Sequence, residues 1–298
     1  MNAHGAEAFR SGFVAIMGRP NAGKSTLMNA LIGEKVAIVS DKPQTTRTRV
    51  MGIACGEGWQ MVFLDTPGLH TPRTKLGEYM VKSANEALEG VDALVVMVDA
   101  GAVGAQDREI IRRMAQVNAP RFLAVNKVDA VSREDLLALL DTLHEADYDA
   151  VVPISAKRGD NVAQLKELLL GSLPPGPRYF PDDMITDQPE RLLVAEIIRE
   201  KALVNLREEV PHGIGVEMQA ITKLSDALTE IHATIYVERE AHKRIVIGRQ
   251  GAMLGRIGTQ ARHDIERLMD TRVALKLWVK VREDWRNRMD DLRTLGYA

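Results

Sequence analysis

The residues Gly18–Ser25 read GRPNAGKS, a spacing of glycines, lysine and serine that suits phosphate chemistry. The glycines allow the backbone to curl so that successive N–H groups point at phosphate oxygens, and the helix that starts there adds a favourable potential. Lys24 can reach the β- and γ-phosphates of a nucleotide, and the Ser25 hydroxyl can ligate Mg²⁺. The pattern predicts a nucleoside triphosphate site, but it does not separate ATP from GTP.

A carboxylate and a glycine for the outer phosphate follow in DTPG, Asp65–Gly68. The Asp65 carboxylate can hold the metal through water, and Gly68 can offer its backbone N–H to the γ-phosphate. Both roles require the tetrapeptide to lie beside the glycine-rich loop.

Two later stretches, NKVD and SAK, indicate which base is bound. Asp129 can accept hydrogen bonds from guanine N1–H and from the exocyclic amine, while Asn126 reaches the other base edge. The Ala156 N–H can meet the guanine carbonyl. Adenine would leave the carboxylate unpaired, and each lost hydrogen bond to a charged group costs about 1.5–3 kcal/mol. These stretches predict guanine.

The elements that must position these residues alternate between short apolar strands and helical patterns in the first half of the chain. Each motif follows such a strand, and ligands of α/β sheets bind at the carboxyl ends of the strands. The alternation predicts a mostly parallel sheet with helices on both faces. The predicted strands are Phe13–Met17, Met61–Leu64, Ala93–Val98, Phe122–Val125 and Val151–Ile154.

The second half of the chain contains IVIGRQGAMLGRIG, in which a Gly-x-x-Gly turn interrupts an apolar run. Between Arg239 and His263 there are six Lys or Arg residues and one acid, in a chain whose net charge is −2. Such a local basic patch is typical of nucleic-acid binding. Two glycines let a nucleic-acid backbone approach main-chain N–H groups, which is how KH domains clamp about four nucleotides of single-stranded RNA.

Helical and strand patterns surround this turn. The spacing predicts a helix over about Arg191–Asn205, strands near Ile214–Ile221 and Ala233–Val237, and a strand over Ala274–Arg282. A helix after the turn should bury Met253, Leu254, Ile257, Ala261, Ile265 and Leu268 on one face.

In this order the motifs resemble the Era family of translation-factor-type GTPases over nearly the whole chain. The resemblance implies an α/β P-loop NTPase domain (residues 9–176), a linker with five prolines between Pro174 and Glu190 (177–190), and an α+β type II KH domain with a C-terminal helix (191–298). The nucleotide is expected on Gly18, Arg19, Pro20, Asn21, Ala22, Gly23, Lys24, Ser25, Thr26, Asp65, Thr66, Pro67, Gly68, Asn126, Lys127, Asp129, Ser155, Ala156 and Lys157. RNA is expected on Lys243, Gly248, Arg249, Gln250, Gly251, Arg256 and Lys280.

The resemblance also assigns PQTTRTR, Pro43–Arg49, as the first switch. Thr46, favoured over Thr45, should bind Mg²⁺ with Ser25 and Asp65 when the γ-phosphate is present. Lys24, Thr46, Gly68 and Asn21 are the expected catalytic residues.

Hydrolysis is expected to be slow. The position after DTPG, where many GTPases carry a water-orienting Gln, is Leu69. Asn21 stands where related GTPases recruit K⁺, although an amide that only stabilises the loop explains it as well. Arg47 or Arg49 is a second candidate source of charge.

On the strand Ala274–Arg282, Leu275, Leu277, Val279 and Val281 should face the core, with Lys276, Trp278, Lys280 and Arg282 on the other face. Trp278 can stack on a base or pack under the final helix, and the sequence favours packing. The four histidines of this half have no metal-ligand spacing.

The cysteine content and the apolar runs of the chain indicate its cellular compartment. A single cysteine, Cys55, excludes an intramolecular disulfide and suits a reducing compartment. The longest apolar run is too short to span a bilayer. We therefore expect a cytoplasmic protein.

The function predicted is a GTP/GDP- and Mg²⁺-dependent switch that hydrolyses GTP and binds the 3′ end of small-subunit ribosomal RNA in small-subunit biogenesis. The RNA and the ribosomal role come from the resemblance, as does partial attachment to the inner face of the membrane. A GTP-dependent RNA-modifying enzyme and a membrane-associated regulatory GTPase are the alternatives, but no second catalytic constellation or amphipathic anchor is visible.

Overall fold

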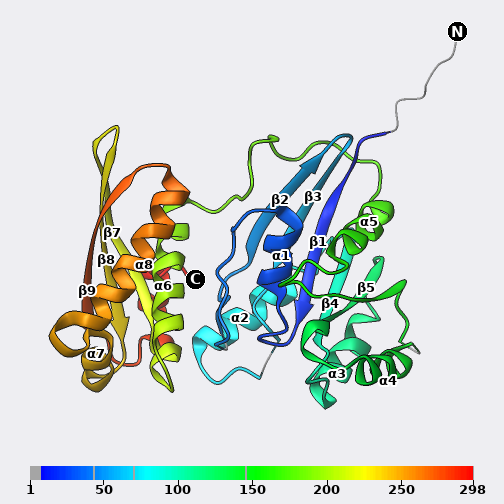
Figure 1. Ribbon diagram of the computed structural model, residues 1–298, viewed down its shortest axis with the longest axis horizontal. Helices are drawn as coiled ribbons and strands as arrows, with labels where there is room; N and C mark the ends of the chain where they lie inside the picture. The colour runs from blue at the N-terminus through cyan, green and yellow to red at the C-terminus, as the bar shows by residue number, and fades with distance from the viewer. Residues whose placement is uncertain (1–7, 43, 70, 145, 298) are drawn as a thin grey trace, which may run out of the picture. The chain divides into compact units, whose positions relative to one another are not determined.

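The computed structural model describes residues 8–42, 44–69, 71–144 and 146–297, so Pro43 of the predicted switch lies outside it (Figure 1). The chain divides into two compact units, the first comprising residues 1–37, 48–70 and 80–187. The second unit comprises residues 38–47, 71–79 and 188–298. The expected switch segment therefore belongs to the second unit through residue 47.

A six-stranded sheet forms the centre of the first unit, in the order β2-β3-β1-β4-β5-β6. All neighbouring pairs are parallel except β2 and β3. The five predicted strands are present, and β2 is a sixth at the edge. The strands are β1 (Arg10–Gly18), β2 (Val50–Gly56), β3 (Trp59–Asp65), β4 (Ala93–Asp99), β5 (Arg121–Asn126) and β6 (Ala150–Pro153).

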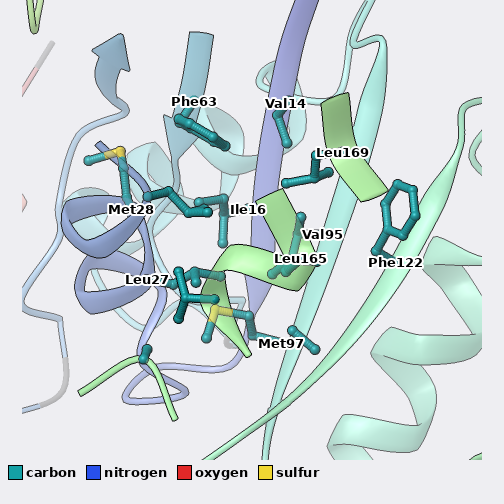
Figure 2. Close-up of a cluster of buried hydrophobic side chains, with 14 of the residues drawn as sticks. Val14, Ile16, Leu27, Met28, Phe63, Val95, Met97, Phe122, Leu165 and Leu169 are labelled. Atoms are coloured by element: carbon teal, nitrogen blue, oxygen red, sulfur yellow. The ribbon is translucent and has the colours of Figure 1, made fainter. Parts of the chain in front are cut away.

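Helices cover both faces of this sheet, because its central strands are apolar on both sides, as parallel strands usually are. On one face, side chains of α1 and α5 such as Leu27 and Leu165 gather against Ile16 and Val95 (Figure 2). The other face packs α3 and part of α2 and α4 against Ala15 and its neighbours. The helices are α1 (Lys24–Ile32), α2 (Lys75–Glu86), α3 (Ala105–Met114), α4 (Arg133–Leu143) and α5 (Val162–Ser172), with a short 3-10 turn η1 (Val128–Ala130).

The first part of the proline-rich segment is held on this unit by hydrogen bonds to β2 and β3. Gln60, which is fully buried, donates to the Phe180 carbonyl at 2.8 Å and accepts from the Phe180 N–H at 3.0 Å. The Ile53 N–H donates to the Ile185 carbonyl at 2.8 Å. The proline-rich segment up to about residue 187 is therefore packed on the first unit and is not a free linker.

The second unit contains a three-stranded sheet in the order β7-β8-β9. Strands β7 and β8 are antiparallel, and β8 and β9 are parallel. Helices α6 and α8 lie over one face of the sheet (Figure 1). The elements are α6 (Glu190–Asn205), η2 (Val210–Gly213), β7 (Gly215–Ser225), β8 (Leu228–Val237), α7 (Glu240–Ile247), η3 (Arg249–Gly251), α8 (Ala252–Met269), β9 (Arg272–Val281), η4 (Trp285–Asn287) and α9 (Met289–Thr294).

The helix after the glycine turn has the predicted apolar face. Ile257, Ala261 and Ile265 are fully buried, and Met253, Leu254 and Leu268 pack against the same core. On β9, Leu275, Leu277, Val279 and Val281 face this core as predicted. The order α-β-β-α-α-β agrees with the KH expectation.

Candidate active site and nucleic-acid groove

The loop between β1 and α1 depends on two glycines. Gly18 has φ +149°, and a Cβ there would lie 2.5 Å from the Met97 carbonyl oxygen. Gly23 has φ +101°, and its Cβ would lie 2.2 Å from Asn126 Nδ2. Because no side chain fits at either position, the conformation of this loop requires glycine at both.

Lys24 directly follows Gly23 as the first residue of α1, and it is only 6% exposed. Its Nζ donates to the carbonyl oxygens of Gly18, at 3.2 Å, and Arg19, at 2.9 Å. Burial lowers the pKa of Lys24 to about 8, although the nearby Asp65 carboxylate opposes the shift. A phosphate group would supply the anionic partner that this buried amine favours.

Ser25 and Asp65 are brought together as the sequence predicts. The Ser25 hydroxyl donates to Asp65 Oδ2 at 2.6 Å. A hydroxyl and a carboxylate are hard oxygen ligands, so the pair fits Mg²⁺ that is also held by nucleotide phosphates. Among the described residues, no three His, Cys, Asp or Glu side chains could hold a metal by themselves.

The DTPG segment is fixed against the glycine-rich loop. The Thr66 hydroxyl donates to the Ile16 carbonyl at 2.9 Å, and the Leu69 N–H donates to the Gly18 carbonyl at 3.1 Å. A Cβ on Gly68 would lie 2.4 Å from the Pro20 nitrogen, so glycine is required there. The Leu69 side chain is buried in the core, and it cannot orient a water by hydrogen bonding.

Asn126 has a structural role that sequence reasoning missed. Its Nδ2 donates to the Ala22 carbonyl at 2.7 Å, and its Oδ1 accepts from the Ala156 N–H at 2.9 Å. Two groups expected to contact the base thus contact each other, and Asn126 is 3% exposed. The amide ties the glycine-rich loop to the SAK loop.

Asp129 is half-buried, and its carboxylate is already oriented by its neighbours. Its Oδ1 accepts from the Ser155 hydroxyl at 2.7 Å, and Arg158 lies 3.6 Å from Oδ2. The Ser155 hydrogen bond is the main cause that holds the pKa of Asp129 below its usual range. An ionised, fixed acceptor is what recognition of the guanine N–H groups requires.

Other residues predicted to bind the nucleotide form contacts that hold the loops of the site in place. Lys127 forms an ion pair with Asp99 at 2.6 Å, and Arg19 forms one with Asp107 at 2.8 Å. Asn21 has a left-handed backbone, φ +64°, which agrees with a loop-forming role without testing its role toward K⁺.

Thr45, Thr46 and Arg47 of the switch segment belong to the second unit, whereas Thr48 and Arg49 belong to the first unit, as do Ser25 and Asp65. Thr46 as a Mg²⁺ ligand therefore stays a prediction. Arg47 is 1% exposed, and its Nη1 donates to the Ile214 carbonyl at 2.6 Å. In this structure Arg47 is not available to supply charge to a phosphate, whereas Arg49 is exposed.

A groove of about 370 Å³ opens beside the Gly-x-x-Gly turn. Gly248 (φ +73°), Gln250 (φ +52°) and Gly251 (φ +79°) form the sharp turn between α7 and α8. Arg249 and Gln250 are exposed at its tip. The groove is lined by Gly251, Leu254, Gly255, Gly258, Thr259, Arg262, Leu275 and Leu277.

Only part of the predicted RNA set lies at this groove. Gly251 lines it, but Lys243 and Arg256 do not. Lys280 lies on the opposite face of the sheet, because it alternates with the core residues Val279 and Val281 along β9. The sequence reasoning missed Gly255, Gly258, Thr259 and Arg262. The spacing of Gly255, Gly258 and Thr259 from Gly251 places small residues along one face of α8, and Arg262 follows one turn later.

Comparisons with known proteins agree with both units. Residues 13–127 match the model of the 50S ribosome-binding GTPase family, and residues 209–286 match the KH domain. The GTPase Era of Ruminiclostridium cellulolyticum is 49% identical over 97% of this chain and 98% of its own length. The GTPase Era of Alkaliphilus metalliredigens is 50% identical over 97% and 99%.

Two solved structures are also similar over nearly their whole length. A crystal structure of Era in complex with MgGDPNP and nucleotides 1506–1542 of 16S ribosomal RNA has a TM-score of 0.93 and 42% identity, covering 97% of this chain and 99% of that one. A single-residue variant of Aquifex aeolicus Era bound to GDP.AlF4⁻ has a TM-score of 0.92 and 43% identity, with the same coverage.

Proposed function

The chain belongs to the Era family of GTPases, and we propose that it uses GTP and Mg²⁺ to control the binding of single-stranded ribosomal RNA by its KH unit. The RNA we propose is the 3′ end of small-subunit ribosomal RNA, and the role is assistance in small-subunit biogenesis. A relative solved with nucleotides 1506–1542 of 16S ribosomal RNA supports this choice.

The nucleotide site in the first unit divides its tasks among few groups. Lys24 and the N–H groups of the glycine-rich loop bind the phosphates, and Asp129 reads the base. Ser25 and Asp65, joined at 2.6 Å, would hold Mg²⁺ with Thr46 from the switch segment. When bound, the metal neutralises charge on the phosphate oxygens.

Hydrolysis by this site is expected to be slow. Unassisted small GTPases turn over at about 10⁻⁴ s⁻¹, and a supplied positive charge accelerates them about 10³- to 10⁵-fold. Leu69 supports slow turnover, because its buried side chain leaves the attacking water without a side-chain acceptor at this position. A K⁺ ion beside Asn21 is one source of charge, and replacing K⁺ by Na⁺ tests it by the change in turnover.

The observation that carries the RNA assignment is the open groove beside the exposed Arg249 and Gln250. Three glycines on its walls leave room for bases, Leu275 and Leu277 offer apolar contacts, and Arg262 adds a positive charge for phosphates. A single-stranded nucleic acid supplies both the bases and the phosphates that such walls suit.

The experiment that tests the proposal replaces Arg249 and Gln250 with Glu. Affinity for an oligonucleotide from the 3′ end of small-subunit ribosomal RNA should fall strongly, while GTP affinity is unchanged. For the wild type, log affinity against log salt should fall with a slope of about −0.7 per phosphate contact. Equal RNA affinity of the variant and the wild type would contradict the proposal.

The cellular location is part of the proposal. We propose a cytoplasmic protein, with a fraction at the inner face of the membrane. Within the ranges that the structure describes, no helix has the length and apolar character needed to cross a bilayer. Fractionation of cells with and without high salt measures the membrane-bound share.

A further inference from the structure

The outward face of β9 carries a tryptophan between basic residues. Along this strand Arg272, Lys276, Trp278 and Lys280 are exposed. Trp278 is 44% exposed, whereas Trp285, in η4, is fully buried. The expectation that Trp278 packs under the final helix is therefore wrong, and a large aromatic ring faces solvent from a regular strand.

Neighbouring side chains hold Trp278 in a defined orientation. The His232 ring lies 5.3 Å from the Trp278 ring, centre to centre, with its plane tilted by 67° in an edge contact. The Glu230 carboxylate lies 2.9 Å from His232 Nε2 and forms an ion pair with Lys276 at 2.6 Å. An indole that is already oriented loses little rotational freedom when a second ring stacks on it.

The positive charges around the Trp278 ring favour the binding of a polyanion. Arg272 and Lys280 form ion pairs with none of the residues that the structure describes. They lie on the same face as Trp278, one on either side of it along the strand. Alternate residues of a strand are about 6.6 Å apart, so this basic stripe runs for roughly 26 Å.

The stripe also continues from the candidate RNA groove. Strand β9 is the edge of its sheet, and its other face contributes Leu275 and Leu277 to the groove. Figure 1 shows β9 at the edge of this sheet, so no further strand separates its two faces on that side. The two faces of one strand thus offer consecutive sites.

We propose that the outward face of β9 is a second contact for the same single-stranded RNA, with an unpaired base stacked on Trp278 and phosphates paired with Lys280 and Arg272. This inference rests on the proposed RNA function of the groove. Stacking on an aromatic ring is tolerant of base identity, so this contact adds affinity and length preference rather than sequence preference.

Two RNA lengths separate this contact from the groove. Oligonucleotides of about four and about twelve nucleotides from the 3′ end of small-subunit ribosomal RNA are titrated onto the full chain, since a KH groove holds about four. Trp278→Ala should weaken binding of the longer RNA about tenfold and leave the shorter one unchanged. Trp278→Phe, which keeps a ring, should retain most of the affinity. Leu224→Ala, at a side chain that is 55% exposed in the same sheet, is the matched control and should change neither.

Tryptophan fluorescence reports the stacking directly. The longer RNA should quench the emission of the wild type, and Trp278→Phe should lose that quenching, because Trp285 is buried and Trp59 lies in the first unit. Lys280→Ala should reduce the salt slope for the longer RNA by about 0.7. These measurements decide the question even where Trp278→Ala fails to fold.

The results that overturn the inference are distinct from those that overturn the groove. If the wild type, Trp278→Phe and Trp278→Ala bind the longer RNA with equal affinity, and the RNA does not quench the emission, the second contact is refuted. That result leaves the proposed RNA binding by the groove intact. If the wild type binds neither the short nor the long RNA, the proposed RNA function itself is refuted. A response of Trp278 emission to anionic phospholipid vesicles, with none to RNA, would assign the stripe to a membrane and refute our inference.

Discussion

The guanidinium of Arg47 lies 5.4 Å from the centre of the Trp285 indole ring, in the core of the second unit. The centre of the Tyr297 ring lies 5.6 Å from the same guanidinium. The carbonyls of Ile214 and His212 accept hydrogen bonds from the Arg47 N–H groups at 2.6 and 3.3 Å. Burial lowers the pKa of Arg47. Residues of the predicted switch are therefore anchored among KH residues by one arginine.

Removal of this anchor should loosen the segment 38–47 and destabilise the second unit. Arg47→Ala leaves the buried Ile214 carbonyl and the partly buried His212 carbonyl without their charged donor, and such a loss costs about 2–3 kcal/mol. We expect a fall of that size in the free energy of unfolding, measured with urea, and faster amide exchange at residues 44–47. Arg49→Ala, at an exposed arginine close by in the chain, should change the free energy of unfolding by less than about 0.5 kcal/mol. Identical exchange in the two variants would show that the Arg47 contacts do not hold the segment.

The buried Lys24 predicts a pH dependence of stability in the nucleotide-free protein. Its folded pKa of about 8 lies below the usual 10.5, so between these values the unfolded chain binds more protons than the folded one. Stability should therefore rise with pH across this window, by at most about 1.4 kcal/mol per pH unit from this group. Because other groups titrate there, the measurement is the difference between the wild type and Lys24→Met in denaturant unfolding at about pH 7.5 to 9.5, a range that spans the lowered pKa. A difference that is flat with pH contradicts the lowered pKa.

The sequence predicted the sheet of the first unit because its strands are short apolar runs, each followed by a motif residue. Strand β2 was not among the predicted strands, since Gly52 and Gly56 weaken its pattern and its pairing is antiparallel to β3. In the second unit the alternation along β9 correctly separated core from surface. These successes come from local periodicity, which one chain segment carries by itself.

The contacts that escaped prediction depend on residues far apart in the chain. The basic loop around Arg47 is typical of a solvated surface, and only the distant Trp285 and Tyr297 make its burial favourable. The double role of Asn126 requires Ala22 and Ala156 to meet at one edge of the sheet. The motif residues were recognised from their order, but their partners follow from the fold.

Asn126 should affect nucleotide binding by placing the loops rather than by reading the base. Asn126→Asp keeps an acceptor for the Ala156 N–H but loses the donor to the Ala22 carbonyl and sets a carboxylate against it. We expect GDP and XDP affinities to fall together, by about tenfold or more. Asp129→Asn is the matched comparison, and it should shift preference from guanine to xanthine. Titrations with fluorescent GDP and XDP check both, and a change of base preference in Asn126→Asp would return this residue to base recognition.

Gly255 should show opposite effects on stability and on RNA binding. A Cβ at this position of α8 meets no atom within 4 Å and points into the groove, so Gly255→Ala introduces no clash in the free protein. Alanine stabilises a helix interior by about 0.5–1 kcal/mol relative to glycine, and the melting temperature should rise. The added methyl occupies space that a base needs, so affinity for the four-nucleotide RNA should fall about tenfold. Gly171→Ala, in α5 and equally free of neighbours, should leave RNA affinity unchanged. If Gly255→Ala bound the RNA as tightly as the wild type, bases would not enter the groove beside this helix.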